Sequence, residues 1–427
     1  MNFLLISGKG AFVVFLVIYF ASCRLLYAGN LHQPADSSRS EQPQHKVTPY
    51  ESNRTVGQHL LAFPSYLLHW VTRPVGMGIK FAEVKLPQLL QGERGPYGVY
   101  PLFELGGNTG AAYGLLLYHN RFLPYNHRVR LEALFGSRRY NDFDFSYEIP
   151  GFIDQSGTLE LDATYANDPE ESLFGGNRSE TTDQKFYATE EIGTSAEYRR
   201  IVSQSVTFGF TGEYRLTRVM QSESSEENLQ RLIPTGFTGT TSLVTTGATL
   251  NFDFAGGTPR INGGSRYRFR LNWNRSLTND RFRFLKYTAE WNQFVPLFFL
   301  PDTRRLAFKG RLQKVAPLAD RAIPFYENPS LGSPYDLRGF SSDRFRDDGS
   351  LLLTLEYRYP IWNFADAVLF VDEGQVFNDY ADIGIKDFNT SYGFGFHLIS
   401  SKGFAFRTEF AFSSETSRVI LSINPNF

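Results

Sequence analysis

Apolar and polar residues alternate with a period of two from about Tyr97 to the end of the 427-residue chain. In the segment Arg266–Asn274 (RYRFRLNWN), aromatic residues and Leu occupy every second position, and Arg or Asn occupies the positions between them. Because successive side chains of a β-strand point to opposite faces of its sheet, this pattern predicts a strand with one apolar face and one cationic face.

The same alternation recurs along the chain and predicts about 16 strands of roughly 8 to 13 residues, the length of a tilted strand that crosses a bilayer. The clearest segments are Phe143–Ile149, Leu159–Tyr165, Val206–Tyr214, Val244–Phe254, Leu285–Trp291, Leu306–Leu312, Leu351–Tyr359, Tyr392–Leu398 and Phe404–Phe412. Alternation alone shows that one face is buried, so a soluble β-sandwich or β-helix is the alternative. Charged polar faces suit a water-filled lumen, and we therefore predict an all-β fold, a transmembrane antiparallel β-barrel.

The connections between the predicted strands alternate in length. Short connections near Ile201–Ser205, Pro360–Ala365 and Ser400–Gly403 interleave with longer polar ones at Ala166–Lys185, Leu216–Thr241 and Ala316–Gly349. This asymmetry is typical of periplasmic turns and outer loops, and an even number of strands returns both ends of the barrel to the periplasm.

The N-terminal region lacks this alternation. Ala11–Ala21 is a continuous apolar stretch after Lys9, which predicts a signal peptide at residues 1–28. In the alternative, Cys23 is the acylated cysteine of a lipoprotein signal. Residues 29–75 are predicted to form a periplasmic tether and a short amphipathic helix, placed at the barrel mouth or on the membrane surface, with a plug in the lumen as the alternative. The barrel then comprises residues 76–427.

The composition supports strands over membrane-spanning helices. Forty Phe, 23 Tyr and 37 Gly against 3 Met fit aromatic strands and interfacial girdles better than helical cores. Mean hydropathy is negative, and after the signal region no apolar run approaches the ~18 to 20 residues of a spanning helix. The 44 acidic and 43 basic side chains leave no net field to attract nucleic acid.

The last predicted strand ends together with the chain. Apolar residues that include Leu421, Ile423 and the terminal Phe427 alternate with Ser and Asn. A soluble domain usually ends in a frayed polar tail, so we interpret these three residues as the C-terminal strand signal of a bacterial outer-membrane protein.

Two short motifs lie on either side of a predicted strand that contains Glu356. The first is Asp336–Phe340 (DLRGF), in the longest connection, and the second is Phe370–Phe377 (FVDEGQVF). Together with Phe174–Asn177 (FGGN), they resemble the outer-membrane assembly and two-partner-secretion superfamily, often called the bacterial surface antigen family. Members of that family carry a [VL]-R-G-[FY] tip on a long sixth loop and F-x-D-x-G on strand 13.

The resemblance implies a 16-stranded barrel whose long sixth loop folds into the lumen, where Arg338 meets Asp372. The guanidinium of Arg338 is a permanently charged planar donor, suited to a bidentate bond with a carboxylate. Glu356 lies on the neighbouring strand and also carries a carboxylate, so either Asp372 or Glu356 could bind Arg338.

The other motif residues have simpler expected roles. Gly339 is expected to let the loop tip turn tightly and approach the wall, and Phe340 to anchor the tip in apolar surroundings. Phe370 shares a strand face with Asp372, and Gly374 completes the strand-13 motif.

The chain departs from the family pattern before its first strand. Members that fold or secrete proteins carry polypeptide-transport-associated modules of roughly 75 residues each, and the segment between the signal and the first strand is too short for one with its linker. The family's opening between the first and last strands still implies a seam between Val99–Leu105 and Val419–Phe427, weakened by Pro425, which has no backbone donor.

These observations lead to three hypotheses about function. The first is a role in insertion or translocation of proteins, or of lipids, at the outer membrane. The second is a plugged passive pore or structural surface antigen, and the third is a membrane anchor for a separately encoded partner. The expected partners are outer-membrane lipids, outer-membrane protein substrates or a periplasmic protein, and the expected state is a monomer.

The sequence predicts no enzyme. Seven scattered His and one Cys form no metal-ligand spacing, and no GxSxG elbow occurs. We therefore expect no catalytic residue, no cofactor, no metal and no nucleic-acid partner.

Overall fold

A computed structural model describes residues 96–423, apart from 108–109, 124–125, 137–138, 175–183, 224–235, 237–238, 256–262, 279, 298–303, 363–364 and 400–404. The predicted signal peptide, tether and amphipathic helix, as well as Pro425 and Phe427, lie outside the described residues.

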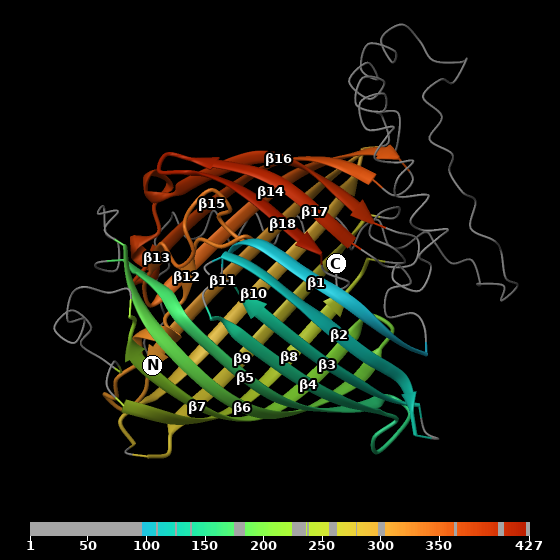
Figure 1. Ribbon diagram of the computed structural model, residues 1–427, viewed down its shortest axis with the longest axis vertical. Helices are drawn as coiled ribbons and strands as arrows, with labels where there is room; N and C mark the ends of the chain where they lie inside the picture. Colours follow the sequence, from blue (N-terminus) through green and yellow to red (C-terminus); the bar gives the residue numbers. More distant parts are fainter. Residues whose placement is uncertain are drawn as a thin grey trace, which may run out of the picture.

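Sixteen antiparallel strands of the described region form a closed barrel, which confirms the predicted fold class (Figure 1). Neighbouring strands follow the chain order, and β1 pairs with β18 to close the sheet. The strands are β1 (Tyr97–Gly107), β2 (Gly110–Phe122), β3 (His127–Gly136), β4 (Asn141–Pro150), β5 (Gly157–Phe174), β6 (Gln184–Ser203), β7 (Val206–Gln221), β8 (Gly239–Asp253), β9 (Gly264–Ser276), β10 (Arg283–Pro296), β11 (Arg305–Pro317), β14 (Gly349–Trp362), β15 (Ala365–Phe377), β16 (Asn389–Ile399), β17 (Ala405–Ser413) and β18 (Ser417–Ile423). In the described part, no helix has the length and apolarity to cross a membrane.

The two faces of the sheet differ as the alternation predicts. On β9, Phe269 and Leu271 point outward and are about half exposed (46% and 50%), as expected of side chains on the lipid-facing side of a barrel. Arg268 points into the lumen beside Asn251 of β8 and Glu290 of β10. The barrel is therefore apolar outside and charged inside.

The strands β5 to β8 are longer than predicted, with 18, 20, 16 and 15 residues. The expected loop at Ala166–Lys185 is largely strand, since β5 continues through a bulge to Phe174. These extended ends are stable because they bury Tyr187 and Val219 against Phe325, which belongs to a later loop. The prediction from local alternation was wrong here because this packing partner lies more than a hundred residues away in sequence.

The longest described connection joins β11 to β14, the eleventh and twelfth strands of the barrel, and we call residues 318–348 the sixth loop. It contains the 3-10 turn η4 (Phe325–Glu327) and a small two-stranded sheet, β12 (Ser330–Leu331) with β13 (Phe345–Arg346). At the opposite end of the barrel, β6 and β7 are joined by a two-residue turn at 204–205, as predicted. The sixth loop therefore lies at the outer end.

Candidate functional site

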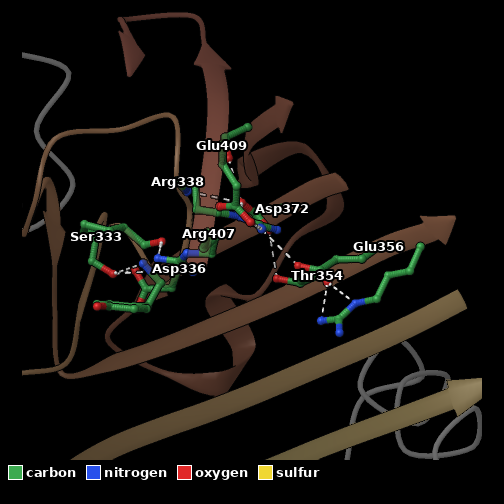
Figure 2. Close-up of polar contacts among 12 residues, drawn as sticks. Ser333, Asp336, Arg338, Thr354, Glu356, Asp372, Arg407 and Glu409 are labelled. Atoms are coloured by element: carbon green, nitrogen blue, oxygen red, sulfur yellow. Dashed lines mark hydrogen bonds and ion pairs between the residues drawn. The ribbon is translucent and has the colours of Figure 1, made fainter. Parts of the chain in front are cut away.

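Arg338, in the sixth loop, reaches the inner wall of the barrel and binds three carboxylates from three strands (Figure 2). Its Nε and Nη2 donate to the two carboxylate oxygens of Asp372 on β15, at 2.9 and 2.8 Å. Its Nη1 donates to Glu356 on β14 at 2.9 Å and to Glu409 on β17 at 3.1 Å. The sequence left Asp372 and Glu356 open as alternative acceptors, and the structure brings both to Arg338.

Two of the three carboxylates accept hydrogen bonds from further donors. Asp372 also accepts hydrogen bonds from Thr354 and Ser391, each at 3.0 Å. Glu356 accepts two from Arg358, at 2.9 and 2.7 Å. These additional hydrogen bonds keep the acceptors oriented toward Arg338, so the guanidinium enters a prepared site.

The charge at the centre of this network is nearly inaccessible to water, since Arg338 is 4% exposed. Burial alone would lower the pKa of Arg338, but the charges of Asp372 and Glu356 and the hydrogen bonds to Asp372 outweigh it and raise the pKa above its ordinary value. The guanidinium therefore stays protonated, and its charge is compensated only while the loop is in place.

Aromatic and apolar contacts complete the attachment of the loop tip. The guanidinium carbon of Arg338 lies 3.5 Å from the ring centroid of Phe370, a cation–π contact. Phe340 is 1% exposed and belongs to a buried apolar cluster that joins loop and wall: Leu331, Leu337, Phe340, Phe345, Leu352 and Val376. Gly374 leaves room for this cluster, because a Cβ there would lie 3.1 Å from a methyl carbon of Leu337.

Of the two roles expected of Gly339, a tight turn and a close approach to the wall, the structure supports the second. The left-handed backbone conformation at the tip belongs to Leu337 (φ 41°), not to Gly339. A Cβ on Gly339 would lie 2.6 Å from the backbone carbonyl oxygen of Phe412 on β17 and 2.9 Å from the Cβ of Ser391. The glycine therefore serves the close approach of the loop to the wall.

We expect Gly339→Ala to destabilise the barrel by about 1 to 3 kcal/mol, because the loop must move away from β17 to relieve the clash. Urea unfolding of the purified protein in detergent measures this cost. Gly310→Ala on β11 is the matched control, since its Cβ would meet atoms only at 3.5 Å or beyond. Equal stability of the two variants would contradict the close-approach role.

Sequence reasoning missed Glu409, which lies on β17 far from either motif. The alternation of β17 places its side chain on the lumen face, where it also lies 2.7 Å from Nε2 of His397. No motif marks it, so only the register of β17 against β16 brings it to Arg338.

A second ionic contact holds the start of the sixth loop on the other side of the lumen. Glu327 of η4 is 3% exposed and accepts hydrogen bonds from Arg215 of β7 and from Lys286 of β10, the latter at 3.2 Å. The loop thus spans the lumen from Glu327 at one wall to Arg338 at the other, and further ion pairs, such as Asp336 with Arg311 of β11 and Arg344 with Glu415, also attach it to the barrel. No sequence pattern marks Glu327, because it is a single acid in a polar loop.

The seam between β1 and β18 has a short backbone ladder. Among the described residues, β18 pairs over all of Ser417–Ile423 with β17 but only over Leu421–Ile423 with β1, opposite Phe103–Leu105. The predicted signal residues Leu421 and Ile423 both belong to these three pairs. Among the described residues on the outer side of these pairs, Val419 and Ile420 of β18 therefore have no registered partner on β1.

The sixth loop contacts both sides of this seam. Tyr335 donates to Glu104 of β1 at 3.2 Å. The backbone oxygen of Pro334 accepts from Arg407 of β17 at 3.1 Å, and the backbone oxygen of Phe340 accepts from Arg418 of β18. The loop therefore connects the two strands that meet at the seam.

No group of three or more metal-ligating side chains occurs among the described residues. The arrangement instead combines a closed sheet, a charged lumen and a loop bound to the inner wall. Such a fold defines an integral β-barrel protein of a bacterial outer membrane.

The chain belongs to the Omp85 superfamily, since the sequence model of the Omp85 superfamily domain matches residues 122–419. This is a family of non-enzymatic membrane insertases and transporters, which confirms the predictions of family, outer-membrane location and lack of enzymatic activity. Comparison with curated proteins gave no match.

Solved structures show the same fold. BamA from Haemophilus ducreyi lacking POTRA domains 1–3 aligns with a TM-score of 0.59 and 15% identity, over 78% of this chain and 70% of that chain. CdiB from Escherichia coli aligns with a TM-score of 0.52 and 12% identity, over 77% and 63%, and CdiB from Acinetobacter baumannii with 0.51 and 13%, over 76% and 59%. The match spans less than two thirds of either CdiB chain.

Proposed function

We propose that this barrel promotes the insertion of proteins, or of lipids, into the outer membrane or their passage across it, and that the seam between β1 and β18 is the part that opens. The observation that carries the proposal is the short ladder of the seam in the described residues, three registered pairs against seven for the same strand on its other side. Strand edges exposed within a membrane lack water as a hydrogen-bond partner, so a partly unpaired seam favours the addition of an incoming strand.

The sixth loop is the element that keeps the seam closed in this proposal. Its contacts with Glu104 on one side and with Arg407 and Arg418 on the other connect the two sides of the seam. The role of Arg338, with Asp372, Glu356 and Glu409, is to lock the loop in that position. Opening of the seam then requires the loop to give up its contacts on one side only.

A disulfide across the seam is the direct test. Leu105 and Leu421 are registered partners, and paired residues of an antiparallel ladder have Cα distances within the range of a disulfide. We expect the Leu105→Cys, Leu421→Cys variant, once oxidised, to fold and reach the membrane but to fail to restore the outer-membrane proteome of a strain depleted of the parent protein. Reduction of the disulfide should restore it.

The matched control moves one cysteine to the other neighbour of β1. Leu105 is also registered with Ala111 of β2, so the Leu105→Cys, Ala111→Cys variant carries a similar bond within a continuous ladder and should retain function. Full function of the seam-locked variant would refute the proposal, and so would an unchanged outer-membrane proteome after depletion of the protein.

A further inference from the structure

Three arginines converge on a single carboxylate at the outer end of β9 and β10. Asp280, in the turn between these strands, accepts from Nε of Arg275 at 2.9 Å, from Nη2 of Arg283 at 2.8 Å to each oxygen, and from Nη2 of Arg321 at 3.4 Å. Arg275 is the last residue but one of β9, Arg283 begins β10, and Arg321 belongs to the start of the sixth loop. We call these four residues the arginine cluster.

The strand alternation places the cluster on the outer surface of the barrel. Arg275 is registered with Arg283, and the next outward pair is Trp273 with Leu285. The pair between them, Asn274 with Phe284, is buried on the inner side, where Phe284 packs beneath the sixth loop. The outward apolar ladder of β9 therefore ends at Arg275, where the hydrocarbon gives way to headgroups of the outer leaflet.

The cluster has an excess of positive charge that the protein does not compensate. Three guanidinium groups face one carboxylate, and Arg275 and Arg321 each keep 46% of their side-chain surface exposed. The hydrogen bonds to Arg283 and Arg275 lower the pKa of Asp280 below its ordinary value, so the acid stays charged and two net positive charges remain.

Several donors of the cluster are available to a ligand. Each guanidinium carries five N–H groups, and the contacts with Asp280 use one nitrogen of each arginine. The remaining donors of Arg275 and Arg321 are accessible, since these two side chains are each 46% exposed. Fixed guanidinium groups with open donors suit the oxygens of phosphate, which they can bind in bidentate fashion.

We infer that Arg275, Arg283 and Arg321 bind the phosphate groups of a phosphorylated lipid in the outer leaflet of the membrane. The lipid source, as opposed to free phosphate, follows from the position of the cluster at the end of a lipid-facing apolar ladder. Leu277, beside the cluster, is 59% exposed and offers an apolar contact to the lipid. Nothing in this inference depends on opening of the seam.

The test measures binding of the full-length protein, freed of lipid in detergent, to diphosphorylated lipid A and to the same lipid without its phosphates. We expect the parent protein to bind the phosphorylated form about tenfold more tightly, as basic side chains near an anionic headgroup contribute. Microscale thermophoresis gives the affinity, and native mass spectrometry gives the number of bound lipids.

Two variants separate lipid binding from a role in holding the turn. Arg275→Gln with Arg321→Gln removes two exposed charges while Arg283 still holds Asp280, and it should lose the preference for the phosphorylated lipid. Asp280→Asn removes the competing carboxylate and should keep or increase that preference. Arg270→Gln is the control, since this arginine lies on the same strand but faces the lumen, opposite Thr249 and Thr288.

Other results would overturn the inference. They are an unchanged preference in the double variant, an equal loss in Arg270→Gln, or loss of the preference in Asp280→Asn, which would make the cluster an anchor of the turn only. Inorganic phosphate at the same phosphate concentration should not compete with the lipid, and full competition would assign the site to free phosphate. If the double variant does not fold, as judged by heat-modifiable mobility, Arg275→Gln alone replaces it.

Discussion

Replacement of Arg338 by alanine is expected to destabilise the protein by about 3 to 5 kcal/mol, the usual cost of removing one partner from a buried ion pair. The cost arises because Asp372 (0% exposed) and Glu409 (0% exposed) stay buried without their cation. The same change frees the loop tip, so single-channel conductance in planar bilayers should show larger or longer openings than the parent protein. Unfolding in urea and conductance are measured on the same preparation.

Two variants calibrate this result. Arg338→Lys keeps the charge but loses the planar fork that binds Asp372 with two parallel bonds, so an intermediate loss is expected. Arg266→Ala removes a lumen arginine whose ion pair with Asp253 is exposed, 44% and 54% for the two side chains, and should cost less than about 1 kcal/mol. Unchanged stability and conductance in Arg338→Ala would contradict the proposed lock.

Replacement of Glu327 by alanine is the second large effect that we expect, with a loss of about 2 to 3 kcal/mol, because hydrogen bonds to charged groups are lost and Arg215 and Lys286 remain partly buried without their acid. Hydrogen exchange should accelerate over residues 318–330, while the segment around Arg338 stays protected. If either attachment alone can largely hold the loop in the lumen, the double variant Arg338→Ala, Glu327→Ala should increase conductance by more than the two single changes combined.

The attachment of the sixth loop through Glu327 should also depend on pH. Burial alone would raise the pKa of Glu327, but Lys286 and Arg215 reverse that effect and lower the pKa below its ordinary value. A carboxylate with a lowered pKa contributes stability that is present above the ordinary pKa and disappears as the pH falls through the folded value. Acid below the ordinary pKa of a glutamate should therefore release the start of the loop in the parent protein, and Glu327→Gln should lack this step. Identical acid profiles of the two proteins would contradict the assignment.

The fold was predictable because the physical signal is local. In β9 and β15 successive residues face lipid and lumen in turn, and the polarity of each residue indicates which side it faces. The pair Arg338 and Asp372 was predictable for another reason, because both lie in short linear motifs. Their contact in the structure agrees with the expectation from the family resemblance.

The rest of the site depends on register, which no local pattern encodes. Glu409 meets Arg338 because β17 is aligned with β16 so that Glu409 lies opposite Gly395. Glu327 accepts a hydrogen bond from Arg215, although the two residues are 112 positions apart in sequence. The lengths of β5 and β6 likewise depend on Phe325, a residue of the sixth loop that packs against them in the closed barrel. Contacts of this kind follow from the closed sheet as a whole.

The unequal length of the strands gives the outer rim of the barrel two heights. β6 has 20 residues, and about ten suffice to cross the hydrocarbon, so the hairpin of β5 and β6 rises above the cell surface as a rigid collar. On the seam side, β17 and β18 are joined by a turn of three residues, 414–416, and end low. A large molecule that approaches from outside, such as an antibody, is therefore blocked on the side of β5 and β6. It can reach the rim on the side of β17 and β18, directly above the strands that the sixth loop contacts.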